Sequence, residues 1–93
     1  QEIWGFIKDL KEPVVLMGDF NSHPAAEGIC TMKKNMTDAS ANVNTTYMNQ
    51  PGDKIDYLFV SGPIKPAGDA WVRGFKEGYS DHGCLLNDFQ ILP

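Results

Sequence analysis

The sequence predicts a single domain over residues 1–93 of the layered α/β (α+β) class, with one mixed sheet and about two helices on one face. Two segments, 14–17 and 55–60, are apolar at nearly every position, as in strands that are covered on both faces. Two others, 1–12 and 24–35, carry apolar residues at helical spacing. With 93 residues, of which 42% are hydrophobic, the chain is long enough for one core.

The first expected element is an amphipathic helix over residues 1–12. Its apolar side chains recur at helical spacing and therefore share one face. The helix should end before Pro13, because a residue that precedes proline is pushed out of the helical region. The inward residues are Ile3, Phe6, Ile7 and Leu10, and Trp4 is interpreted as a further core residue.

Residues 13–22 are expected to form a strand with a functional site at its end, because an apolar run gives way to polar side chains within three residues. Asp19 and Asn21 are two positions apart, so their side chains point the same way in an extended chain. Gly18 lets the backbone turn or approach a ligand closely. Sites in open α/β sheets lie at the carboxyl ends of strands. This carboxylate and carboxamide would suit a metal-bound phosphate and its water.

A second helix is expected over residues 24–35. Pro24 fits its first turn, and Glu27 lies near the positive end of the helix dipole. Lys33 and Lys34 lie near the negative end. The inward stripe is expected to consist of Ile29 with Met32 or Met36.

Residues 37–53 are predicted to be mostly loop, with one short strand at 45–48 and a turn at 51–53. Two loop residues keep two interpretations each. Asp38 is a turn or cap residue, since short acids bond their own backbone, or a metal ligand. His23 is an ordinary loop histidine or a residue that faces the substrate, because one histidine near acids does not decide between them.

Segment 54–61 is the second expected strand, and a single acid, Asp56, lies among its apolar residues. Burying a carboxylate there costs several kcal/mol unless a cation or a hydrogen-bond donor meets it. His82 is a suitable partner, because a carboxylate fixes the tautomer of the ring and raises its basicity. We therefore predict a hydrogen bond that places a carboxylate oxygen of Asp56 within about 3.2 Å of a ring nitrogen of His82.

The last third of the chain is expected to add two strands. Residues 64–75 form one strand, interrupted around Pro66 and Gly68, and a closing strand follows Gly83. The residues expected to pack are Trp71 and Phe75 in the first strand and Leu85, Phe89 and Ile91 in the second. The basic residues Lys65, Arg73 and Lys76 form a solvated face or line a cleft. Cys30 and Cys84 are interpreted as buried free thiols rather than as a disulfide or metal ligands.

Three motifs occur in order: Gly-Asp-Phe-Asn at 18–21, Ile-Asp-Tyr-Leu-Phe-Val-Ser-Gly at 55–62 and Ser-Asp-His-Gly at 80–83. Together they resemble the carboxyl-terminal half of the endonuclease/exonuclease/phosphatase superfamily, which contains DNase I-like nucleases, abasic-site endonucleases, neutral sphingomyelinases and inositol polyphosphate phosphatases. The resemblance covers residues 13 to about 91. It implies half of a four-layered DNase I-like sandwich, with the active site in a cleft at one edge.

The resemblance also implies a role for each polar residue of the motifs. Asp19 would orient or deprotonate the attacking water, and Asn21 would hold a phosphate oxygen. His82 would contact the scissile phosphate, and Asp56 would orient its ring from behind. Asp81, together with Asp19, would hold a divalent ion, Mg²⁺ or Mn²⁺, which the isolated chain would bind only weakly.

Part of the family's site has no counterpart in this sequence. A metal-binding Glu, an early Asn and a second His belong to the family's amino-terminal half, and no residue before Asp19 replaces them. Gly83 and Cys84 also stand where the family has a bulkier residue followed by Pro or Ala. Two hypotheses follow: the chain is a fragment, inactive alone, of a divalent-metal phosphoester hydrolase, or it is a non-catalytic half-domain that self-associates or binds a partner.

The resemblance has consequences for partners as well. In the family the two sheets pack face to face, so one face of this sheet is expected to lack cover, and we expect a homodimer or a complex with the missing amino-terminal half. The net charge of −4 argues against a broad basic surface for nucleic acid. No apolar run approaches the roughly 20 residues that span a bilayer. Whether the phosphoester substrate is nucleic acid, phospholipid or inositol phosphate stays open.

Overall fold

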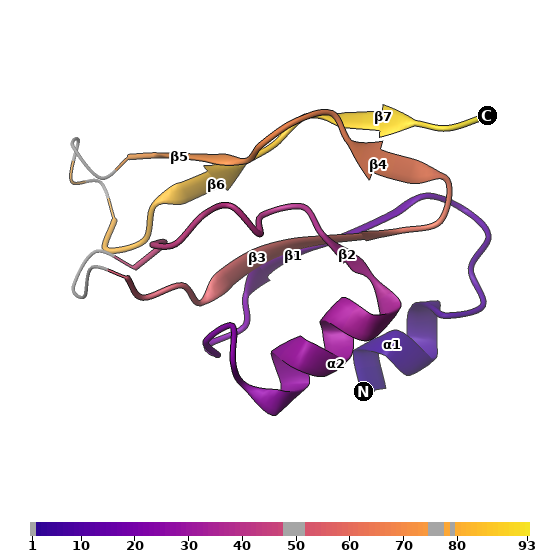
Figure 1. Cartoon of the computed structure of the whole chain (residues 1–93), viewed down its shortest axis with the longest axis horizontal. Helices are drawn as coiled ribbons and strands as arrows, with labels where there is room; N and C mark the ends of the chain where they lie inside the picture. The colour runs from indigo at the N-terminus through magenta and orange to yellow at the C-terminus, as the bar shows by residue number, and fades with distance from the viewer. Residues whose placement is uncertain (1, 48–51, 75–77, 79) are drawn as a thin grey trace.

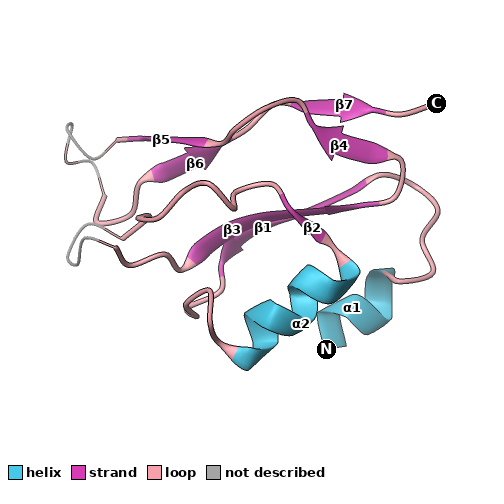
Figure 2. Cartoon of the chain, in the orientation of Figure 1, coloured by secondary structure: helices cyan, strands magenta, loops and turns pink. Residues whose placement is uncertain are grey.

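The structure is a computed structural model that describes residues 2–47, 52–74, 78 and 80–93, apart from the side chains of residues 2 and 3. Figure 1 shows the helices on one side of a three-stranded sheet and a strand ribbon on the other, and Figure 2 separates helices, strands and loops in the same view. The predicted α+β class is confirmed. The elements are α1 (Glu2–Ile7), β1 (Val14–Asp19), α2 (Glu27–Asn35), β2 (Thr37–Asp38), β3 (Asp56–Ser61), β4 (Ile64–Pro66), β5 (Trp71–Arg73), β6 (Cys84–Leu86) and β7 (Phe89–Ile91).

The central sheet has the order β1-β3-β2, and both strand pairs are antiparallel. Strand β3 lies in the middle, and its residues between the two ends are buried, as the nearly continuous apolar run predicts. The register runs from Val14 opposite Ser61 to Asp19 opposite Asp56. The last residue of β1 and the first residue of β3 therefore bring two acids to the same end of the sheet.

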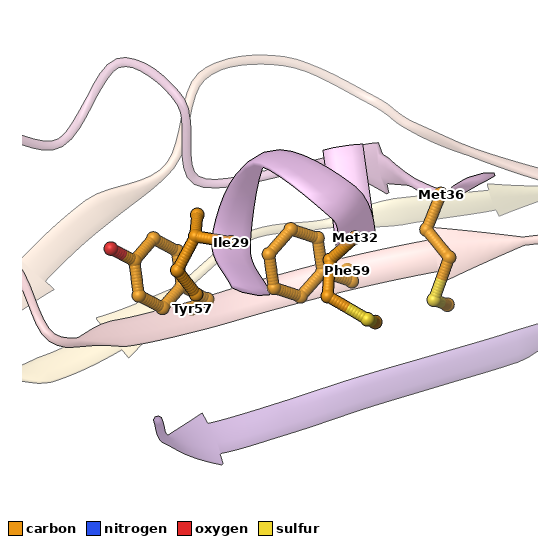
Figure 3. Close-up of a cluster of buried hydrophobic side chains, with 5 residues drawn as sticks. All are labelled: Ile29, Met32, Met36, Tyr57 and Phe59. Carbon is orange, nitrogen blue, oxygen red and sulfur yellow. The ribbon is translucent and has the colours of Figure 1, made fainter. Parts of the chain in front are cut away.

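One face of this sheet packs against the helices. Because side chains alternate along a strand, Tyr57 and Phe59 of β3 both point to this face. Their rings are stacked with centroids 5.4 Å apart. They are buried together with Ile29, Met32 and Met36, so the predicted inward stripe of the second helix is confirmed (Figure 3). Burial of side chains of this size contributes about 1.5–3 kcal/mol each.

The opposite face of the sheet is covered by the chain itself. Strand β4 pairs with β7 and β5 pairs with β6, both antiparallel, and these four strands form the ribbon that lies over the sheet (Figure 1). Leu58 and Val60 of β3 pack there with Ile64, Leu85 and Phe89 of the ribbon. The prediction of an uncovered face is therefore wrong at β3, although Met17 of β1, on the same face opposite Leu58, is 63% exposed.

The strand pairing also differs from the single mixed sheet that the sequence predicted. The described strands form three sheets, one of three strands and two of two strands, and every pair is antiparallel. The reason is that residues 64–91 fold back over the central sheet instead of extending it. Asn87 holds this arrangement, because its side-chain amide donates to the backbone carbonyls of Ala39 at 2.8 Å and Gly68 at 3.0 Å.

The first helix is shorter than predicted. Helix α1 ends at Ile7 rather than near residue 12, and a turn follows in which the Leu10 N–H donates to the Ile7 carbonyl at 3.0 Å. Trp4 and Ile7 pack against the core, whereas Phe6 is 84% exposed and Leu10 is 49% exposed. A helix of six residues turns only one narrow side to the sheet, so the predicted apolar stripe is only partly buried.

The second helix also begins later than predicted. Pro24 lies in the turn before α2, and the helix starts at Glu27. The predicted placement of charge is confirmed, because Glu27 is in the first turn and Lys33 and Lys34 are in the last.

Several predictions for the loops and the last strands need correction. Of the strand predicted at 45–48, Tyr47 forms an isolated bridge with His82. The interruption predicted around Pro66 and Gly68 within 64–75 is confirmed, because β4 ends at Pro66 and β5 begins at Trp71. Trp71 and Ile91 are exposed on the ribbon rather than packed, at 38% and 62%.

The cysteines are free, as predicted, but exposed rather than buried, because Cys30 lies on the outer side of α2 and Cys84 opens β6. Lys65 and Arg73 are exposed on the ribbon, which fits a solvated face. Met48, Pro51, Phe75 and Lys76, for which the sequence predicts strand, turn, packing and surface roles, lie outside the described residues. Among the described residues, neither helix is long and apolar enough to cross a membrane.

Candidate functional site

The buried acid of β3 has the partner that the sequence predicts. Asp56 Oδ2 lies 2.7 Å from His82 Nδ1, so the predicted hydrogen bond is confirmed. The Asp56 side chain is 15% exposed and that of His82 29%, which shields the bond partly from water. A carboxylate at Nδ1 fixes this nitrogen as the protonated one and leaves Nε2 as the outward-facing atom of the ring.

The outward nitrogen of His82 faces two further acids. Its Nε2 lies 3.8 Å from Asp19 Oδ2 and 4.0 Å from Asp81 Oδ1. The side chains of both acids are about half exposed, so the space in front of Nε2 is open to solvent. Three segments that are distant in the sequence, namely the end of β1, the start of β3 and residues 81–82, thus meet at one place.

Asn21, the remaining predicted site residue, lies in the loop directly after β1. Its backbone has φ +48°, in the left-handed region that asparagine tolerates better than most residues. Its N–H donates to Asp19 Oδ1 at 2.7 Å. The two oxygens of Asp19 therefore do different things: Oδ1 shapes the loop that carries Asn21, and Oδ2 faces His82.

Two hydrogen bonds hold the loop after β1 against the beginning of β3. The Phe20 N–H donates to the Ile55 carbonyl at 2.8 Å, and the Tyr57 hydroxyl donates to the Ser22 carbonyl at 2.8 Å. Burial of the Tyr57 phenol, and secondarily the nearby carboxylates, raises the pKa of Tyr57 to about 12. The hydroxyl therefore remains a neutral donor at every physiological pH.

A third contact that holds the loop after β1 in place involves His23, for which the sequence left two interpretations. His23 Nε2 contacts Asp53 Oδ1, which joins the loop after β1 to the segment that leads into β3. The side chain of His23 is largely exposed. The sequence places Asp53 only in a turn, and a pairing across 30 positions leaves no local signal there.

The environment of His82 raises its pKa above the ordinary 6.5. The main cause is the hydrogen bond to Asp56, which partial burial opposes, and the negative charges of Asp56, Asp19 and Asp81 add to it. A raised pKa favours the imidazolium form of the ring. A positively charged ring with Nε2–H directed outward is suited to bind an anionic oxygen.

A buried charge pair between β2 and the segment that leads into β3 was not anticipated from the sequence. Lys54 Nζ lies 3.7 Å from Asp38 Oδ2, with side chains that are only 3% and 5% exposed. Asp38 Oδ1 accepts the N–H and the hydroxyl of Ser40 at 2.8 and 2.6 Å. The side chain of Asp38, the last residue of β2, therefore caps the turn that follows, in agreement with the turn or cap interpretation. Burial lowers the pKa of Lys54, and the charge of Asp38 opposes this effect.

The side chains that could hold a metal ion are also present. Ligand atoms of Asp19, Asp56 and His82 all lie within 4.8 Å of one another. Within this group Asp56 and His82 Nδ1 are engaged with each other, so Asp19 is the carboxylate that remains for a hard cation. Asp81, 4.0 Å from His82 Nε2, is not a member of the group. Mg²⁺ commonly binds through one or two carboxylates and keeps several waters, and this donor set fits that habit.

The chain matches a protein-family model and is similar to a solved structure. Residues 2–82 match the model of the Endonuclease/Exonuclease/phosphatase family. The chain is also similar to the crystal structure of the endonuclease/exonuclease/phosphatase from Bacteroides vulgatus, at 25% sequence identity and a TM-score of 0.80. That match covers 97% of this chain and 41% of the other, so the chain spans less than half the length of that protein. No curated protein matched.

Proposed function

The chain belongs to the endonuclease/exonuclease/phosphatase family, and we propose that it carries part of the active site of a divalent-metal-dependent phosphoester hydrolase. One observation carries the proposal: His82 is held at Nδ1 by Asp56 and directs Nε2 toward Asp19 and Asp81. A fixed imidazole beside exposed carboxylates supplies both an anion-binding donor and acceptors for a water or a cation.

His82 is proposed to contact the scissile phosphate. In the imidazolium form, Nε2–H donates to a phosphate oxygen and stabilises the negative charge that develops during hydrolysis. Asp56 is proposed to keep the ring in this orientation from behind. The bond to Asp56 raises the pKa of His82, which increases the share of this form at a given pH.

Asp19 and Asn21 are proposed to act on the other side of the phosphate. Asp19 Oδ2 orients the attacking water or accepts its proton, while Oδ1 keeps its bond to the loop backbone. The Asn21 carboxamide donates to a phosphate oxygen. The fastening of this loop to β3 fixes where Asn21 stands relative to His82.

Asp81 and Asp19 are the residues proposed to hold Mg²⁺, with Mn²⁺ as the alternative. When bound, such an ion neutralises charge on the non-bridging phosphate oxygens. Both carboxylates are well exposed, so binding by this chain alone should be weak. Because the chain spans less than half of the similar Bacteroides vulgatus protein, we propose that hydrolysis requires further residues, from an amino-terminal half or from a second copy.

The metal and phosphate roles can be tested by NMR titration of this chain. Mg²⁺ followed by inorganic phosphate should shift the signals of Asp19, Asp81 and His82, and Asp81→Asn should weaken the Mg²⁺ response severalfold. Asp88→Asn, which changes an exposed acid next to β7, is the matched control and should leave the response unchanged. Shifts that are absent, or that are equal in both variants, would refute the proposed site.

The isolated chain is also expected to hydrolyse phosphodiesters negligibly, because it lacks those further residues. The measurement is release of nitrophenol from bis(p-nitrophenyl) phosphate with Mg²⁺ or Mn²⁺. Robust turnover that Asp19→Asn abolishes would show that no further residues are needed, while leaving the hydrolase assignment intact.

A second candidate function, a non-catalytic binding module, is favoured by one observation. Beside Asp56 lies a hollow of about 180 Å³ whose apolar lining includes Met17, Leu58 and Leu85. Met17 is 63% exposed, which is unusual for an apolar side chain in a sheet. If the chain acts only by binding, His82→Ala should leave partner affinity unchanged and Met17→Lys should lower it.

A further inference from the structure

We propose that Thr46 is the positioning residue that holds Asp56 and His82 within hydrogen-bonding distance of each other. Asp56 belongs to the central sheet, whereas His82 stands just before β6 in the ribbon. No strand pairing joins the two residues among the described parts of the chain, so another segment must set their separation. The catalytic consequence of this role rests on the proposed function, but the positioning itself does not.

Thr46 is fastened to Asp56 through its side chain. Its Oγ1 accepts the N–H of Asp56 at 3.2 Å and the N–H of Ile55 at 3.1 Å. Thr46 is fully buried, with 0% of its surface exposed, so water cannot take the place of the hydroxyl. Buried backbone donors that lose their acceptor must find another partner or remain unsatisfied, and the start of β3 would shift to do so.

Thr46 is fastened to the His82 segment through its backbone. Its carbonyl accepts the N–H of Gly83, the residue after His82, at 2.8 Å. The next residue, Tyr47, forms an antiparallel bridge with His82, and the centroids of the two rings are 5.2 Å apart. One short segment thus contacts both members of the Asp–His pair.

The segment itself is anchored at a third point. The N–H groups of Thr46 and Tyr47 both donate to the Asp53 carbonyl, at 3.0 and 3.1 Å. Asp53 in turn contacts His23, in the loop that follows Asn21. Thr46 therefore connects the start of β3 with the His82 segment and, through Asp53, with the loop after β1. Its hydroxyl makes the hydrogen bond to Asp56.

The role can be tested with a pair of matched substitutions. Thr46→Val keeps the shape of the side chain but replaces the hydroxyl with a methyl group, whereas Thr46→Ser keeps the hydroxyl and loses the methyl group. The readout is the Nδ1 proton of His82 in the NMR spectrum of the metal-free chain, a signal that depends on the bond to Asp56. His23→Gln removes the other histidine and secures the assignment, and Asp56→Asn shows the spectrum without the carboxylate.

The wild type and Thr46→Ser should show a slowly exchanging, downfield Nδ1 proton for His82. Thr46→Val should lose or broaden this signal, while its amide spectrum remains that of a folded chain. A folded Thr46→Val variant with the signal unchanged would overturn the proposal, as would a Thr46→Ser variant that loses it. This readout requires no hydrolysis, so failure of the proposed function would leave it interpretable.

If Thr46→Val does not fold, the wild type and Thr46→Ser decide the question together. The amide protons of Ile55 and Asp56 should then be protected from hydrogen exchange in both proteins. Exchange as fast as that of an exposed loop amide would overturn the role of the Thr46 hydroxyl.

Discussion

His82 titrates while it contacts the Asp56 carboxylate and faces two others, which raises its pKa above 6.5. In the metal-free chain, we expect an NMR titration of His82 to give a pKa above that of an unfolded chain, and Asp56→Asn to lower it. A raised folded-state pKa means that the folded state binds the proton more tightly. The stability that protonated His82 contributes is therefore fully present below about pH 6.5 and is lost as the pH rises through the folded-state pKa of His82.

The free energy of unfolding of the wild type should accordingly fall, relative to that of Asp56→Asn, as the pH rises through this window. Urea unfolding at several pH values on both sides of the transition measures the difference. A His82 pKa below the ordinary value, or one that Asp56→Asn leaves unchanged, would contradict the expected electrostatics.

Gly62 offers a second test at the scale of one residue. It lies in the turn between β3 and β4 with φ +79°, and a Cβ atom there would stand 2.6 Å from the Glu12 carbonyl oxygen. Gly62→Ala should destabilise the chain by about 1–3 kcal/mol, because the left-handed backbone is strained for alanine and the Glu12 backbone cannot yield easily. Urea unfolding provides the measurement.

Gly68→Ala is the matched control for that substitution. A Cβ atom added at Gly68 would have no heavy atom within 4 Å, and the backbone there has no left-handed φ. Its replacement should change the free energy of unfolding by no more than about 0.5 kcal/mol. Equal effects at the two glycines would show that the close approach of residue 62 to Glu12 does not determine the loss of stability.

At the scale of elements, the buried pair of Asp38 and Lys54 joins β2 to the segment that enters β3. Asp38→Asn leaves the Lys54 ammonium buried without its counter-charge, which should cost about 3–5 kcal/mol. Replacing both residues, with Asp38→Asn and Lys54→Met, should cost less than the sum of the two single changes, because no unpaired charge remains. A double-mutant cycle by urea unfolding measures this coupling.

Lys34→Met serves as the control for the cycle, since Lys34 is exposed in the last turn of α2. Its substitution should change stability by about 0.5 kcal/mol or less. Strictly additive single effects at Asp38 and Lys54 would mean that the two charges do not stabilise each other.

At the scale of the whole molecule, the open edge of the central sheet bears on self-association. Strand β1 is an edge strand, and among the described strands β3 is its one partner. Its backbone edge and the exposed Met17 offer a surface on which a second chain can pair. Because the ribbon covers the sheet face at β3 but leaves Met17 of β1 exposed, we expect the homodimer to form along the β1 edge rather than face to face.

Sedimentation velocity over the micromolar range measures the association. Met17→Lys should shift the chain toward the monomer, because edge lysines oppose strand pairing. Phe6→Lys removes a comparably exposed apolar side chain on α1 and should leave the association unchanged. A wild-type chain that stays monomeric throughout this range would contradict the prediction that chains associate along the β1 edge.

The sequence by itself determined the α+β class, the helical face of the core and the pairing of Asp56 with His82. Each of these follows from a local physical constraint. Apolar periodicity reports which side of an element is buried, as at Ile29 and Met32. A carboxylate in an apolar strand must find a donor, and His82 was a suitable one.

Apart from the pairing of Asp56 with His82, only the tertiary structure decided which distant segments lie against each other. The ribbon covers the second face of the sheet, and Thr46 connects Asp56 to the His82 segment, although neither arrangement has a signature in local spacing. The pairs of His23 with Asp53 and of Lys54 with Asp38 are likewise contacts across many positions. A threonine or a lysine in a polar stretch has the same local sequence signal whether it is solvated or buried, because its burial depends on where the rest of the chain packs.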